Sequence, residues 1–216
     1  KYRKRCVGGF GDIATFSFYG NKIITTGEGG MVVTDNQELA KKVRLLKGQG
    51  MDTSRRYWFP VVGYNYRMTN VQAAIGLAQL ERIDWFIERR REVARWYDDL
   101  LKDFSVIKTP VEASWAKNVY WLYSVCLSED YNRDLLIAQL LEEGIETRPF
   151  FYPLHHMPPY LADNEEANCP VAVELAARGL SLPSSATLTE EDVTYIVGVL
   201  RACLQKQVDD RKQRAD

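Results

Sequence analysis

A lysine-containing, glycine-rich loop between two short apolar runs is the feature that most constrains the fold of this sequence. The first run, residues 12–19, has the length and composition of a buried strand. Residues 20–22, Gly-Asn-Lys, end it, and residues 29–34 read as a second strand entered through glycines. The chain must therefore turn between two strands, with Lys22 directly after the first.

Further along, the pattern of apolar residues predicts helices that alternate with short extended segments. A capping box at Thr69–Gln72 opens a long helical stretch that continues to Leu100. We expect the charge run Glu88–Glu92 on that stretch to form a solvated face. Other expected elements are helices at 37–46, 132–143, 171–177 and 190–204, a strand at 118–127, an extended piece at 145–148, and proline-rich loop structure at 149–160.

Composition excludes several classes of protein. The 216 residues carry 28 Lys and Arg against 29 Asp and Glu, and this balance argues against a basic nucleic-acid-binding domain. With 46% hydrophobic residues the chain can bury a core, but no apolar run reaches the roughly 18 residues of a membrane span. No secretory signal is recognisable, so we expect a cytoplasmic protein.

The four cysteines, Cys6, Cys126, Cys169 and Cys203, stand far apart, and the two histidines are adjacent at 155 and 156. A zinc site needs clustered ligands, so we expect no metal. In a cytoplasmic protein the cysteines are expected to be reduced and mostly to fill the core.

Lys22 is a candidate nucleophile on chemical grounds. An amine attacks a carbonyl only when deprotonated, and desolvation at the end of a strand favours the neutral form. The residues alone leave a second reading open, since most lysines after a strand are surface residues.

Three segments, taken together, resemble a known family. They are Phe16–Gly30 (Phe-Ser-Phe-Tyr-Gly-Asn-Lys … Thr-Gly-Glu-Gly-Gly), Gly63–Leu80 (Gly-Tyr-Asn-Tyr-Arg-Met-Thr-Asn … Gln-Leu) and Glu146–His155. They resemble signatures of the DegT/DnrJ/EryC1/StrS sugar aminotransferases. The resemblance implies an α/β, aspartate-aminotransferase-like fold of the type I pyridoxal-phosphate enzymes.

The resemblance also implies roles for individual residues. Lys22 would hold pyridoxal 5′-phosphate covalently and then shuttle a proton, and Ser17 would donate a hydrogen bond to the cofactor phosphate. Asn65 would reach that phosphate from the neighbouring subunit, so that a homodimer shares the active site. Substrate contacts are expected from Arg67, Arg148 and His155, although Arg67 could equally be a structural ion-pair partner and His155 could satisfy its own loop.

The details of the motifs are most similar to the branch that forms GDP-perosamine. This implies amination at C4 of GDP-4-keto-6-deoxymannose, with glutamate as the amino donor. Two alternatives remain open. One is a non-catalytic remnant that oligomerises or binds a partner. The other is a related sugar dehydratase, against which Lys22 counts because that branch carries histidine there.

The order of the motifs implies a division of the chain. Residues 1–103 would be the C-terminal portion of a large cofactor domain, cut from a parallel sheet, and would include the long helix. Residues 104–207 would be a complete small α+β domain, and residues 208–216 a charged, frayed tail. The family's aspartate that binds the cofactor ring nitrogen would lie before Lys1, so we expect a truncated chain. Whether this chain is active by itself is left open.

Overall fold

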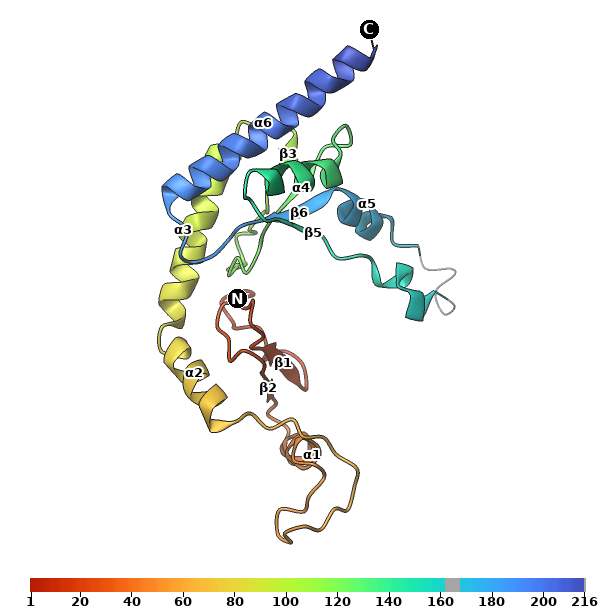
Figure 1. Ribbon diagram of the computed structural model, residues 1–216. Coiled ribbons are helices and arrows are strands. Elements are labelled where there is room, and N and C mark those ends of the chain that lie inside the picture. The colour runs from red at the N-terminus through yellow and green to blue at the C-terminus, as the bar shows by residue number, and fades with distance from the viewer. Residues whose placement is uncertain (162–167, 216) are drawn as a thin grey trace. The chain divides into compact units, whose positions relative to one another are not determined.

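The computed structural model describes residues 1–161 and 168–215, which form two compact units (Figure 1). The first unit comprises Lys1–Ile87 and Glu112–Asn118, and the second comprises Glu88–Val111 and Val119–Asp216. Helix α3 (Ile83–Leu101) begins in the first unit and continues in the second. The domain boundary expected at residue 103 stays a prediction.

The first unit contains the two strands that the sequence predicts around the lysine loop. Strand β1 (Ala14–Ser17) pairs with β2 (Gly30–Val33), with Ser17 opposite Gly30. The pair is antiparallel, so the expectation of a parallel sheet is wrong for the described strands of this unit. An antiparallel pair needs only a loop between its strands, whereas a parallel pair needs a long crossover, and the chain returns here directly.

Two helices follow in the first unit, and the cap of the second is the predicted one. The Asn36 side chain accepts hydrogen bonds from the first turn of α1 (Gln37–Lys47), and the box of Thr69 and Gln72 caps α2 (Asn70–Leu80). The predicted continuous helix to Leu100 is wrong, because the chain breaks between α2 and α3. There the Arg82 amide bonds the Gln79 carbonyl, a tighter turn that ends the α-helical ladder.

The second unit is built on a four-stranded antiparallel sheet of order β3-β4-β6-β5. Strand β4 begins later than predicted because Tyr120 has a left-handed φ of 44°, which interrupts the extended chain. Strand β6 lies in a segment where the sequence analysis expected no strand. The strands are β3 (Ile107–Lys108), β4 (Tyr123–Leu127), β5 (Arg148–Pro149) and β6 (Gly179–Leu182).

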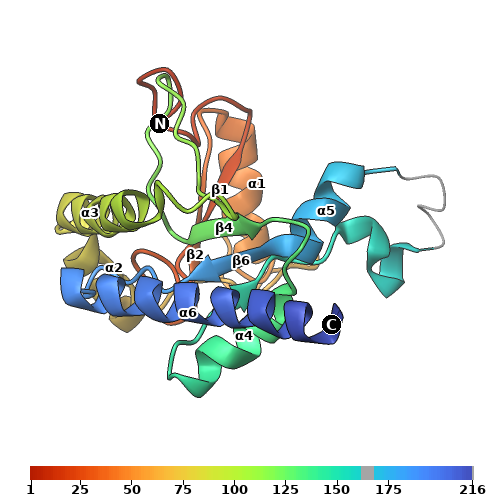
Figure 2. The same ribbon diagram turned by 90° about the horizontal axis from the view of Figure 1, so that it is seen from above.

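Helices complete the second unit where the sequence predicts them, with small shifts at their ends except at the C-terminal end of α6. Helices α4 and α6 lie side by side in both views (Figures 1 and 2). Together with α3 and the sheet they enclose the buried core. The helices are α4 (Arg133–Glu142), α5 (Pro170–Arg178) and α6 (Glu190–Ala215), with the short 3₁₀ turns η1 (Leu154–His156) and η2 (Pro158–Tyr160) in the proline-rich loop.

The C-terminal segment is helical where the sequence analysis expected a frayed tail from residue 208. Helix α6 continues to Ala215, and Asp216 lies outside the described residues. Contacts with the turn before α4 explain the extra turns. The Gln207 side chain bonds both the amide and the carbonyl of Asn132, and the Arg211 guanidinium donates to the Asp130 carbonyl and lies over the Tyr131 ring.

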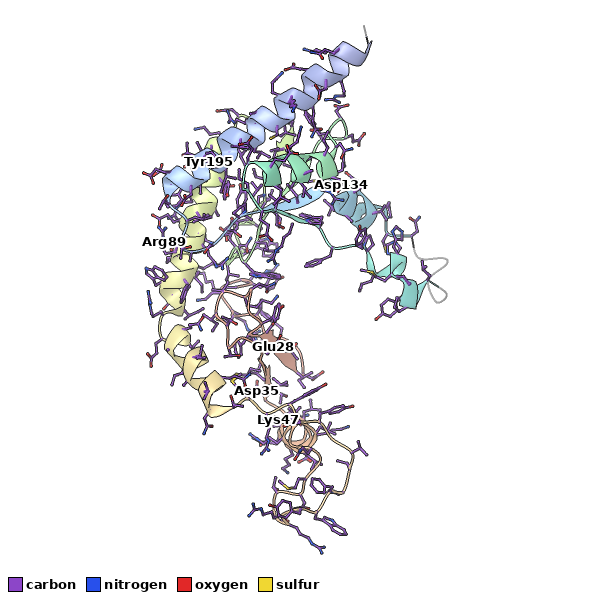
Figure 3. All side chains as sticks on the ribbon, in the orientation of Figure 1. Glu28, Asp35, Lys47, Arg89, Asp134 and Tyr195 are labelled. Carbon is purple, nitrogen blue, oxygen red and sulfur yellow. The ribbon has the colours of Figure 1, made fainter. Side chains whose placement is uncertain are left out.

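The charge run Glu88–Glu92 is not the solvated face that the sequence suggested. The Arg89 guanidinium donates to the carbonyls of Ala186 and Leu188, and Figure 3 shows this side chain on α3. Arg90 is also half-buried and bonds backbone carbonyls of the second unit. Both arginines bind the chain between β6 and α6 to α3.

No helix among residues 1–161 and 168–215 is both long enough and apolar enough to cross a membrane. All four cysteines are free thiols, with Cys126 and Cys203 buried and Cys6 and Cys169 exposed. The expectation that most cysteines pack in the core is therefore right for two of the four.

Candidate functional site

The loop that carries Lys22 has a fixed shape. The Phe18 carbonyl at its base accepts hydrogen bonds from the Thr26 amide and the Thr25 hydroxyl, both at 2.9 Å. At its tip the Lys22 amide donates to the Tyr19 carbonyl at 3.0 Å. Lys22 is half-buried, so its amine stands on a closed, hydrogen-bonded loop rather than on an open surface segment.

Ser17 is the last residue of β1, immediately before this loop. Its Oγ accepts a hydrogen bond from the Tyr19 amide at 3.4 Å. A serine hydroxyl can accept and donate at once, so the O–H remains able to donate to an anion. The side chain is exposed, as a ligand-binding hydroxyl must be.

Asn65 is held by a short backbone ladder in the first unit. The Tyr64 amide bonds the Leu46 carbonyl at 2.7 Å, and the Tyr66 amide bonds the Lys47 carbonyl at 3.0 Å. Asn65 itself forms an antiparallel bridge with Gly48. Its backbone is therefore fixed on both sides, while its side chain is exposed.

Two glycines make that ladder possible. Gly50 has a φ of +75°, and a Cβ added there would come within 2.0 Å of the Val61 carbonyl oxygen. A Cβ on Gly63 would lie 2.2 Å from the Gly50 nitrogen. No larger residue fits at either position without moving the backbone, and the backbone of Asn65 would move with it.

The predicted site residues fall into two groups. Lys22, Ser17, Asn65 and Arg67 belong to the first unit, whereas Arg148 and His155 belong to the second. Arg67 and Arg148 are exposed, and His155 is half-buried with its ring 4.4 Å from that of His156 in an edge contact. The structure thus brings the proposed cofactor residues into one unit.

The sequence analysis missed a set of residues that contact the lysine loop. The side chains of Gln72 and Gln79, on α2, hydrogen-bond the backbone of Glu28 and Thr25 in that loop. Only the capping role of Gln72 was expected. The signal that could have found them is their spacing, since positions seven apart share one face of a helix.

No group of three or more His, Cys, Asp or Glu side chains that could hold a metal ion occurs in residues 1–161 and 168–215. The proposed cofactor residues Lys22, Ser17 and Asn65 offer instead an amine, a hydroxyl and an amide. Such a set suits an organic ligand with an anionic group better than a cation.

Comparison with known proteins agrees with these local features. The profile of the DegT/DnrJ/EryC1/StrS aminotransferase family matches residues 1–201. The chain is 50% identical to the GDP-perosamine synthase of Caulobacter vibrioides, over 92% of this chain and 54% of that protein. The GDP-perosamine synthase of Escherichia coli O157:H7 is 47% identical, over 91% of this chain and 53% of its own length.

A solved structure gives the same result for the fold. It is the putative sugar aminotransferase Spr1654 of Streptococcus pneumoniae in its PMP-form. It superposes with a TM-score of 0.89 at 26% identity, covering 98% of this chain and 56% of that one. The chain therefore spans about half the length of the relatives it matches. On the family profile and these similarities, the chain belongs to the DegT/DnrJ/EryC1/StrS aminotransferase family.

Proposed function

We propose that the protein carrying this chain transfers an amino group from glutamate to C4 of a 4-keto-6-deoxy sugar nucleotide. The proposed reaction is of the type that converts GDP-4-keto-6-deoxymannose to GDP-perosamine. The observation that carries the proposal is the 50% identity to a GDP-perosamine synthase over 92% of the chain. A cytoplasmic location, expected from the sequence, is part of the same proposal.

The residues of the lysine loop fit pyridoxal 5′-phosphate as the cofactor. Lys22 offers an amine that can bind its aldehyde, and Ser17, at the start of the same loop, offers a hydroxyl that can donate to its phosphate. When bound, the cofactor supplies the carbonyl that accepts the amino group and a ring that withdraws electrons. The Lys22 amine then holds and moves the proton on the substrate carbon.

Asn65 enters the proposal as a residue shared between copies of the chain. Its amide can donate a second hydrogen bond to a phosphate, and its backbone ladder would hold that amide in place. Following the family resemblance, we propose that the phosphate bound by Asn65 lies in the active site of the neighbouring subunit of a homodimer. The site would then be complete only in the dimer.

Substrate contacts are proposed for three further residues. Arg67 is an exposed guanidinium group that can bind an anionic group of a ligand, and Arg148 is an exposed guanidinium group that can hydrogen-bond the sugar. His155, in η1, can hydrogen-bond a sugar hydroxyl. Glutamate, the proposed donor, would use the same cofactor in the first half of the reaction.

Cofactor trapping tests the central assignment. The protein is incubated with pyridoxal phosphate and reduced with borohydride, and the modified residue is identified by mass spectrometry. Modification at Lys22 is expected. Labelling only at other lysines, or none in the assembled protein, would exclude an aminotransferase that uses Lys22.

A pair of substrates tests the sugar nucleotide. The loaded protein receives glutamate and either GDP-4-keto-6-deoxymannose or a UDP-linked 4-keto sugar. We expect amination of the GDP sugar. Turnover of the UDP sugar alone would retain the aminotransferase and overturn the perosamine-forming reaction.

A further inference from the structure

One face of α2 is shaped to hold the loop that follows Lys22. Gln72, Gly76 and Gln79 are four and three residues apart, so they lie along the same side of the helix. Each of the three meets a different residue of the segment Thr25–Glu28. The contacts are two side-chain amides bound to backbone and one glycine against a methyl group.

The Gln79 side chain binds both backbone polar groups of one loop residue, Thr25. Its Oε1 accepts a hydrogen bond from the Thr25 amide at 3.1 Å, and its Nε2 donates to the Thr25 carbonyl at 2.6 Å. A paired contact of this kind imitates a neighbouring strand, and it fixes the orientation of the backbone as well as its distance. No smaller or apolar side chain can replace both bonds.

Gly76 lets the helix approach closely at the next residue. Thr26 is only 4% exposed, and a Cβ added at Gly76 would lie 2.8 Å from its Cγ2 methyl. Gln72 completes the face, since its Nε2 donates to the Glu28 carbonyl at 3.1 Å while its Oε1 accepts from the Thr69 amide in the helix cap. The helix cap and the loop are thus joined through a single side chain.

These contacts lie at the C-terminal end of the lysine loop, away from the end that follows β1. Phe18, next to β1, closes the loop by accepting hydrogen bonds from Thr25 and Thr26, and α2 contacts both of these residues. A shift of Thr25 relative to Phe18 would open the loop and move Lys22.

We infer that Gln79, Gly76 and Gln72 are positioning residues for the Lys22 amine. Helix α2 sets where the amine stands relative to the hydroxyl of Ser17. This inference rests on the proposed function, because it assigns the three residues a part in bringing the amine to the aldehyde of the cofactor. None of the three needs to touch the cofactor itself.

The test compares two quantities in the purified protein incubated with pyridoxal phosphate. One is the total cofactor that stays bound through gel filtration, and the other is the cofactor fixed to Lys22 by borohydride. If the amine is displaced while the phosphate contacts survive, only the second falls. We expect the ratio of fixed to bound cofactor to fall about tenfold in Gln79→Leu, since small misplacements of a reacting group have effects of that order or more.

Gly76→Ala gives the second variant and separates positioning from helix stability. Alanine favours the helix more than glycine, so a merely structural role predicts no loss. Positioning predicts a lower ratio, because the new methyl group must push Thr26 away. The matched controls are Gln205→Leu and Gly198→Ala on α6, where a Cβ at Gly198 has open space and Gln205 binds only Asp209 among the described residues.

Each outcome decides the matter. A reduced ratio in both α2 variants, with both controls at the wild-type value, supports the inference. A ratio unchanged in Gln79→Leu and Gly76→Ala, or a parallel fall of bound and fixed cofactor, overturns it and leaves the proposed function standing. Absence of Lys22 labelling in the wild-type protein overturns the proposed function and the inference together.

Discussion

The two units of this chain differ in how they bury their side chains. The second unit encloses a core with contributions from α3, α4, α6 and the sheet, and several of its leucines and tyrosines are fully buried. In the first unit, all of whose residues are described, only Thr26 and Gly50 are buried, and α2 has no buried residue. Yet Lys22, Ser17 and Asn65 lie in the first unit. The residues proposed to bind the cofactor and most of the packed core thus lie in different units.

The largest expected effect is chemical and lies in the first unit. Lys22→Arg keeps the positive charge but removes the amine that attacks an aldehyde. We expect borohydride fixation at residue 22 to vanish and turnover to fall by at least about a thousandfold, as for other covalent catalytic groups. The free energy of unfolding, measured with denaturant, should remain within about 0.5 kcal/mol of wild type.

Lys41→Arg on α1 is the matched control, since Lys41 is exposed and pairs with Glu38 in the same unit. It should leave fixation at Lys22, turnover and the free energy of unfolding unchanged. If Lys22→Arg instead destabilised the protein as strongly as loss of a core leucine, Lys22 would have a structural role and the contrast between the units would fail.

The next largest expected effect is on the free energy of unfolding, and it compares a leucine in each unit. Leu140 on α4 is 0% exposed in the core of the second unit, whereas Leu80 at the end of α2 is 53% exposed. Leu140→Ala should cost about 2–5 kcal/mol, because it removes buried methyl groups and leaves a cavity. Leu80→Ala should cost about 0.5 kcal/mol or less.

Denaturant unfolding of both variants measures the difference. A large loss at Leu80 would show that α2 is covered in the assembled protein by something that this chain does not supply. That result would sharpen the comparison by showing that the first unit acquires its core from outside.

A smaller effect is expected where α3 holds the second unit together. The Arg90 guanidinium donates to the Trp121 carbonyl at 2.9 Å and to the Ser184 carbonyl at 2.8 Å, and burial lowers its pKa. Arg90→Met keeps the length of the side chain but removes the donors. Leaving these part-buried carbonyls without their donor costs about 1–3 kcal/mol, which thermal unfolding can detect.

Arg95→Met, at an exposed position on the same helix, is the control and should be close to neutral. Equal effects of the two substitutions would mean that Arg90 contributes only helix propensity.

The sequence predicted those parts of the fold that depend on neighbouring residues. The strands around Lys22, the cap at Thr69, and helix α4, which is followed by Gly144 at a φ of +76°, all follow from local patterns. Strand β6 was missed because it is only four residues long, so its alternation of Leu with Gly and Ser is a weak local signal. Contacts distant in sequence, such as that of Gln207 with Asn132, extended α6 beyond the local signal.

The candidate site shows the same limit. The amine of Lys22 after a strand already suggested a nucleophile, and the family resemblance assigned cofactor roles to Lys22 and Ser17. The pairing of Gln79 with Thr25 could not be predicted, because it joins residues that come together only when α2 meets the loop. Burial of Arg89 and Arg90 was missed for the same reason, since a charge run carries no sign of the carbonyls that it will meet.

The smallest expected effect is a pH dependence of stability that differs between the helix caps of the two units. Helix α2 in the first unit is capped by Thr69 with Gln72, a neutral pair, whereas α6 in the second unit is capped by Thr189 with Asp192. Hydrogen bonds from the Thr189 amide at 2.8 Å and its hydroxyl at 2.9 Å lower the pKa of the Asp192 carboxyl.

Because the folded pKa lies below that of the unfolded chain, the cap stabilises α6 above the ordinary aspartate pKa of about 3.9, and this contribution is lost as the pH falls below that value. The unfolding free energy of the wild type minus that of Asp192→Asn should therefore shrink as the pH falls from about 5 to about 3. The matched difference for Gln72→Ala on α2 should stay constant over that range, since no group in that cap titrates. A pH-dependent difference at Gln72, or a constant one at Asp192, would show that charge does not distinguish the two caps.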